Sequence, residues 1–140
     1  MPRPLLALSA FLVALPLLAE DPAAIARRVH DASVEPAPLI DALRSNDGIA
    51  RATAARVALV RNVTAAVPAL REALAKETHH DAAREEVRAL VLLGSDEDVA
   101  FAAQQLPRYP TSIDGEFGDA MARIGGQRAI DLYFRHARGL

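Results

Sequence analysis

The sequence predicts an all-α fold, an α-α superhelix of about three stacked helix pairs with a single helix flanking each end. Alanine supplies about a fifth of the 140 residues, and it is the strongest helix former and the smallest core residue. Apolar positions recur with a period of about 31 residues, which fits one helix pair per repeat. Residues that start and stop helices divide each period into two segments.

Composition limits the classes of partner and site. The chain carries a net charge of −2 with four Phe, two Tyr and no Trp, whereas nucleic-acid binders usually have a basic excess and aromatic side chains for stacking. A nucleic-acid partner is therefore not expected. The absence of cysteine excludes disulfides, thiolate metal sites and thiol nucleophiles.

Residues 1–19 have the layout of a secretory signal peptide. One positive residue precedes an apolar run from Leu5 to Leu18, and the acidic Glu20 follows the small residue Ala19. The run is about fourteen residues long, shorter than the twenty or so that cross a bilayer as a helix, so no stable membrane anchor is expected. We expect export to the periplasm or the exterior, with cleavage after Ala19.

The rest of the chain divides into two parts. Residues 20–36 are interpreted as a partial repeat and linker, because Ile25 and Val29 lie at helical spacing in the segment 22–30. Residues 37–140 are interpreted as the repeat domain. In chain order, the expected helices cover residues 36–45, 48–61, 65–76, 79–93, 96–106, 112–124 and 127–137.

Helix-start signals support these boundaries. Pro36 and Pro38 suit the first turn of a helix, and Asn46-Asp47-Gly48 predicts a turn before the next one. The segments from Thr78 to Asp81 and from Ser95 to Asp98 have the capping-box pattern, a hydroxyl followed three residues later by a carboxylate. We therefore expect a helix to begin at each of these two segments.

Three expected helix ends fall in one column of the repeat. Asn62, Gly94 and Gly125 are separated by 32 and then 31 residues, and both residue types tolerate the left-handed conformation that follows many helices. We expect all three residues to adopt this conformation. The same spacing aligns apolar residues, such as Ala58, Leu90 and Met121.

Three segments resemble HEAT repeats of the short, bilin-lyase-like kind: Pro38 to Leu43, Val67 to Leu74 and Ala120 to Ile130. The resemblance covers about residues 37–137. It implies a HEAT-like solenoid in which the second helix of each pair lines a concave surface. The members of this family mostly hold partner proteins, and a few act as enzymes.

Five arginines are candidate partner-binding residues. Arg56 and Arg88 share a column on successive second helices, and Arg51, Arg84 and Arg123 lie within a turn of that column. On a concave surface they would face an acidic segment of a protein partner, since guanidinium groups bind carboxylates through two bonds. The alternative is that the arginines pair with solvent or with acidic side chains of the chain itself, namely Glu85, Glu86 and Asp119.

No motif predicts a catalytic residue, a cofactor site or a metal site. Adjacent helical residues point about 100° apart, so His79 and His80 indicate a helix start rather than a metal site. The predicted function is an exported, non-catalytic protein-protein interaction module or scaffold. The alternative is a bilin-lyase-like or other small-molecule-binding HEAT-repeat enzyme subunit. We also expect self-association through the C-terminal helix, where Tyr133, Phe134 and Leu140 are apolar, because solenoid ends expose apolar faces.

Overall fold

A computed structural model describes residues 35–109 and 113–137, and all secondary structure within these ranges is helical. The predicted all-α class is therefore confirmed. The expected signal peptide at residues 1–19 and the expected helix at residues 22–30 lie outside the described residues. No helix in the described part of the chain is long and apolar enough to cross a membrane.

Seven α-helices and two short 3₁₀ helices follow one another in the described residues. Each predicted helix of the repeat domain is present, and its ends differ from the prediction by no more than two residues. The α-helices are α2 (Pro36–Leu43), α3 (Gly48–Val60), α4 (Val67–Lys76), α5 (His80–Leu93), α6 (Asp96–Gln105), α7 (Ile113–Ile124) and α8 (Gly126–Ala137). The 3₁₀ helices are η1 (Thr64–Ala66) before α4 and η2 (Leu106–Arg108) after α6.

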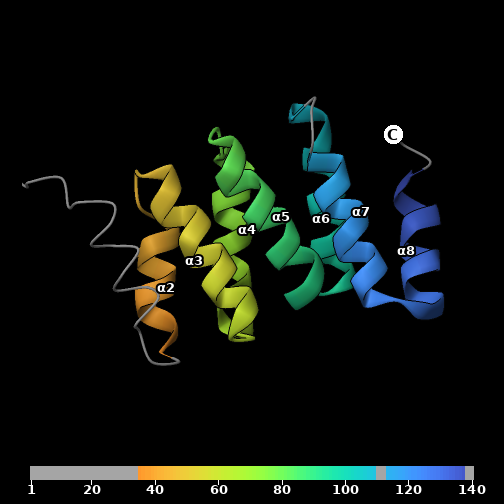
Figure 1. The fold of residues 1–140 in the computed structure, drawn as a ribbon, viewed down its shortest axis with the longest axis horizontal. Helices are drawn as coiled ribbons and strands as arrows, with labels where there is room; N and C mark the ends of the chain where they lie inside the picture. The colour runs from red at the N-terminus through yellow and green to blue at the C-terminus, as the bar shows by residue number, and fades with distance from the viewer. Residues whose placement is uncertain (1–34, 110–112, 138–140) are drawn as a thin grey trace, which may run out of the picture.

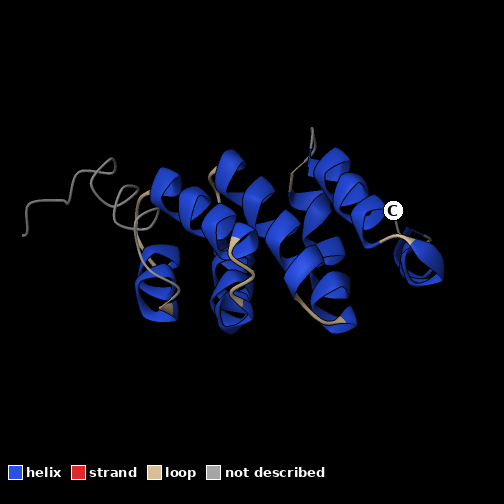
Figure 2. Ribbon diagram, turned by 60° about the horizontal axis from the view of Figure 1, so that its bottom comes forward, coloured by secondary structure: helices blue, strands red, loops and turns tan. Residues whose placement is uncertain are grey.

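The helices form two layers (Figures 1 and 2). One layer contains α2, α4 and α6, and the other contains α3, α5 and α7. Within the second layer α5 packs on both α3 and α7, α3 also packs on α2, and α5 also packs on α4 and α6. The last helix, α8, packs on α6 and α7 at one end of the molecule.

Small and large apolar side chains have different places in the core. Ala54 and Ala58 of α3 and Ala83 of α5 are fully buried, and their small size allows these two helices to pack closely. Leucines, including Leu70 and Leu74, fill the space between the two layers. The alanine content that predicted helices therefore also explains their close packing.

One of the two predicted capping boxes is present. The Ser95 side chain accepts a hydrogen bond from the backbone amide of Asp98, and the Asp98 carboxylate accepts one from the amide of Ser95. The capping box predicted from Thr78 to Asp81 is wrong. The helix begins one residue later, with His79 as its N-cap, and the Nδ1 atom of His79 accepts from the amide of Ala82 at 3.4 Å.

The left-handed backbone conformation predicted after three helices is confirmed at two of the three positions. Asn62 and Gly125 have φ angles of 55° and 64°. The prediction is wrong for Gly94, which is extended with φ −83° and ψ 177°. Glycine is required there for a steric reason, because a Cβ atom would lie 2.5 Å from both the Asp98 Cβ and the Leu90 carbonyl oxygen.

Candidate functional site

A groove of about 460 Å³ runs along α3 and α5, on the layer that contains the predicted arginines. Its lining is mainly polar and charged, with few apolar side chains. The lining residues are Ile49, Ala52, Thr53, Arg56, His79, Asp81, Arg84, Glu85 and Arg88. Three of the five candidate arginines therefore lie together in this groove.

Each of the three groove arginines contacts an acidic side chain. Arg56 donates to Glu85 at 2.7 Å, and Arg88 contacts the other oxygen of Glu85 at 3.4 Å. Arg84 and Arg88 both donate to the carboxylate of Glu116 on α7. We call these five residues the outer cluster.

The outer cluster is electrostatically coupled across three helices. Hydrogen bonding from Arg84, followed by hydrogen bonding from Arg88, holds the pKa of Glu116 below its ordinary value against the opposing effect of burial. The hydrogen bond to Glu85 raises the pKa of Arg56, and the hydrogen bond to Glu116 raises the pKa of Arg84. The Glu116 carboxylate thus remains charged at neutral pH and orients the guanidinium groups of Arg84 and Arg88.

The other two candidate arginines do not line the groove. Arg123 is exposed on α7. Arg51 points into the molecule, where its Nε and Nη2 atoms donate to the two carboxylate oxygens of Glu77 at 2.5 and 2.7 Å. Its Nη1 atom donates to the carbonyl oxygen of Ser45 at 2.7 Å, which ties the α2–α3 turn to the α4–α5 connection.

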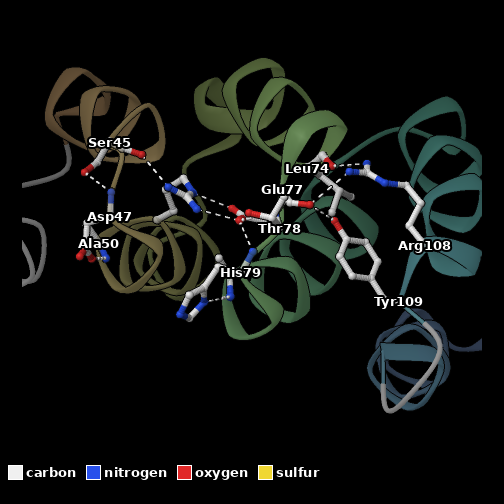
Figure 3. Close-up of polar contacts among 11 residues, drawn as sticks. Ser45, Asp47, Ala50, Leu74, Glu77, Thr78, His79, Arg108 and Tyr109 are labelled. Atoms are coloured by element: carbon white, nitrogen blue, oxygen red, sulfur yellow. Dashed lines mark hydrogen bonds and ion pairs between the residues drawn. The ribbon is translucent and has the colours of Figure 1, made fainter.

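Glu77 is the centre of a buried network that joins three helix pairs (Figure 3). Its carboxylate accepts from the backbone amides of Thr78 and His79 at 2.8 and 2.7 Å. Its carbonyl oxygen accepts from the hydroxyl of Tyr109 at 2.7 Å and from Arg108 at 3.1 Å. Burial acts to raise the pKa of Glu77, but the hydrogen bonds from Arg51 and from the His79 amide outweigh it and hold the pKa below its ordinary value.

Glu86 lies beside this network and is fully buried. Neither of its carboxyl oxygens accepts a hydrogen bond from a donor among the described residues. Burial, followed by the charge of the neighbouring Glu77, raises the pKa of Glu86 to about 9, although Arg51 acts in the opposite direction. At neutral pH Glu86 is therefore a neutral acid beside the charged Glu77. Arg51, Glu77 and Glu86 are called the inner cluster below.

The pairing partners differ from those that the sequence suggested. Glu85 pairs with arginines as expected in the alternative interpretation, whereas Glu77 and Glu116 were not expected as partners. The repeat spacing contains a signal for Glu116 alone. Arg84 and Glu116 are 32 residues apart, about one repeat, and lie on successive helices of one layer, whereas Arg51 and Glu77 are 26 residues apart and Glu77 lies in the connection before α5.

The described residues contain no group of three His, Asp or Glu side chains placed to hold a metal ion. The only histidine lining the groove, His79, is engaged as the N-cap of α5. With paired charges on its walls, the groove can offer guanidinium donors and carboxylate acceptors to a polar ligand. Comparison of the sequence with known proteins finds no matching family model, no matching curated protein and no matching solved structure.

Proposed function

We propose that the protein is an exported, non-catalytic protein-binding module of the HEAT-like solenoid type, which holds an acidic segment of its partner in the groove along α3 and α5. The observation that carries this proposal is the arrangement of Arg56, Arg84 and Arg88 along one groove. The two-layer stacking of helix pairs supports the superhelical architecture. The layout of residues 1–19 supports export.

The outer cluster suits carboxylate recognition because Glu85 and Glu116 already orient its arginines through hydrogen bonds. Arg56 contacts Glu85 through one guanidinium nitrogen, and 65% of its side chain is exposed. An arginine that is already oriented loses less conformational freedom when it binds a carboxylate. The encounter with an acidic segment should also be faster at low salt, because exposed charges are screened as the ionic strength rises.

The binding test uses two labelled peptides of equal length, hexaglutamate and hexalysine. We expect the protein to bind hexaglutamate more tightly, with affinity that falls between about 20 mM and about 300 mM salt. Arg56→Gln should weaken hexaglutamate binding about fivefold, as expected for the loss of one exposed charged contact. Fluorescence anisotropy measures both effects.

The control is Arg44→Gln. Arg44 is the exposed C-cap residue of α2 and pairs with Glu72 at 3.3 Å, so it matches Arg56 in type and pairing but lies in the other layer. Its substitution should leave peptide binding unchanged. Equal affinity for the two peptides, or equal weakening by the two substitutions, would refute binding in the groove.

Export has its own measurement. In a bacterial host the chain should appear outside the cytoplasm with a new N-terminus near Glu20, because the apolar run engages secretion. Intact-mass analysis of each cell fraction shows where the N-terminus lies. The complete chain in the soluble cytoplasm would contradict export and leave the groove proposal to the peptide experiment.

A further inference from the structure

The groove between α3 and α5, which lie side by side in one layer (Figure 2), differs in chemistry between its two ends. Ile49 and His79 line it where both helices begin, and Arg56 and Arg88 line it about two helical turns further along. The helix starts approach closely, because a Cβ atom at Gly48 would lie 2.3 Å from the Cγ atom of His79. The groove therefore has one end at the helix starts and one end that carries arginines.

The end at the helix starts carries an exposed apolar side chain. Ile49 is 57% exposed and lies on the same face of α3 as the small residue Ala52. Two polar side chains beside it are engaged within the chain. The Thr53 hydroxyl donates to the Ile49 carbonyl oxygen at 2.8 Å, and the Nδ1 atom of His79 accepts from the Ala82 amide at 3.4 Å. A ligand side chain that packs on Ile49 would therefore gain mainly by burying apolar surface.

Charge is distributed unevenly along the groove. Asp81 lines the end at the helix starts, its side chain is 72% exposed, and its carboxylate lies 3.8 Å from the guanidinium group of Arg84. At the arginine end, the guanidinium groups of Arg56 and Arg88 both contact the single lining carboxylate there, that of Glu85. A carboxylate of a ligand is therefore favoured at the arginine end and disfavoured beside Asp81.

We propose that the groove selects an acidic segment that also carries a large apolar side chain about three residues from its carboxylates. This inference rests on the proposed function and adds the specificity of the same groove. Seven positions separate Ile49 from Arg56, or about 10.5 Å along α3, and an extended peptide covers that length in about three residues. The apolar side chain packs on Ile49, and the carboxylates bind Arg56 and Arg88.

The test measures how much one leucine adds to peptide binding by the protein in the form that its host delivers. One labelled peptide contains a leucine, two serines and three glutamates, and a second has the same residues in reverse order. Each is compared with a counterpart in which serine replaces the leucine. In one of the two orders, leucine should tighten binding about fivefold, as expected for partial burial of one apolar side chain. Fluorescence anisotropy at about 20 mM salt measures it.

Three variants assign the gain from leucine to its place in the groove. Ile49→Ser should remove the gain, whereas Val60→Ser, which removes a 78% exposed apolar side chain of the same helix outside the groove, should leave it unchanged. Asp81→Asn should narrow the preference for leucine over glutamate at that peptide position about twofold. Circular dichroism confirms that each variant keeps its helicity.

The outcomes separate this selection from the proposed function. No gain from leucine in either order, or an equal gain in Ile49→Ser and Val60→Ser, would overturn the selection. If Arg56→Gln still weakens hexaglutamate binding in that case, the proposed function stands without it. If hexaglutamate binds no better than hexalysine, both proposals are wrong.

Discussion

The inner and outer clusters use the same residue types, both include residues of α3 and α5, and differ chiefly in burial. Arg51 of the inner cluster and Arg56 of the outer cluster both lie on α3, and each pairs with a glutamate further along the chain. The side chains of Arg51 and Glu77 are 14% and 0% exposed. In the outer cluster, Arg56 remains largely in solvent while its glutamate is mostly covered.

Burial decides what each cluster contributes. A buried charge pair must be satisfied completely, because loss of one partner leaves an uncompensated charge in the interior. An exposed pair contributes little to stability, since water and salt compete with it. We therefore expect the inner cluster to be needed for the stacking of helix pairs and the outer cluster to contribute little to stability. Adjacent residues of α5 belong to different clusters, because neighbouring side chains on a helix point about 100° apart. Glu85 lines the groove, whereas Glu86 is fully buried.

The largest effect should come from Arg51→Met. The substitution leaves the Glu77 carboxylate without its only ion-pair partner among the described residues and beside the buried Glu86. We expect a loss of about 3–5 kcal/mol in the free energy of unfolding at pH 7, the usual cost of breaking a buried pair. Urea unfolding followed by circular dichroism measures it.

The matched control is the double variant Arg51→Met with Glu77→Gln. A neutral glutamine removes the uncompensated charge and retains one acceptor for the amides of Thr78 and His79. It should recover part of the lost stability. If Arg51→Met unfolds at the same urea concentration as the original protein, the inner cluster does not stabilise the stack and the contrast with the outer cluster fails.

The next largest effect depends on pH and comes from Glu86→Gln. The folded-state pKa of Glu86 is raised to about 9 from an ordinary 4.5, so between these values the folded protein holds a proton that the unfolded chain releases. The original protein should therefore lose stability as the pH rises through this window, by about 1.4 kcal/mol per pH unit. Glu86→Gln removes this pH dependence. The free energy of unfolding of the variant should therefore rise relative to that of the original protein from pH 5 to pH 8.

Other titrating groups act in a different pH range. The folded-state pKa values of Glu77, Asp98 and Glu116 are lowered, so their stabilisation is present above their ordinary pKa values and is lost as the pH falls through the folded-state values. The loss of stability between pH 5 and pH 8 is thus assigned to Glu86, which interacts with Glu77, Arg51 and Tyr109. Parallel stability curves for Glu86→Gln and the original protein from pH 5 to pH 8 would contradict this assignment.

The sequence predicted the helices well because their determinants are local. Pro36, the Ser95 capping box and the helical spacing of apolar residues act within one turn or one helix, and each is visible in a short window. Gly94 shows the limit of such reasoning. Its residue type and its place in the repeat column predicted a left-handed helix end, but glycine is required by contacts with the Asp98 side chain of the next helix and with the Leu90 carbonyl oxygen.

The candidate site was predicted only in part, for a related reason. The repeat period placed Arg56, Arg84 and Arg88 on one side of successive helices, and they do line one groove. The repeat period did not distinguish the groove arginines from the buried Arg51. The orientation of α3, which buries Arg51 and exposes Arg56, depends on its packing against α5. Burial of Glu77 and Glu86 likewise follows from three helix pairs meeting at one point, which short-range patterns do not specify.

The smallest effect on stability is expected for Arg56→Gln, and this substitution completes the contrast with Arg51. Glu85 keeps its contact with Arg88, and a glutamine at position 56 can still donate a hydrogen bond. The free energy of unfolding should change by less than about 0.5 kcal/mol, as for other exposed pairs. Urea unfolding and hexaglutamate binding measured in one buffer should show weakened binding with unchanged stability. A loss above about 1 kcal/mol would place Arg56 with Arg51 among the residues that hold the helix pairs together, and the outer cluster would then be structural.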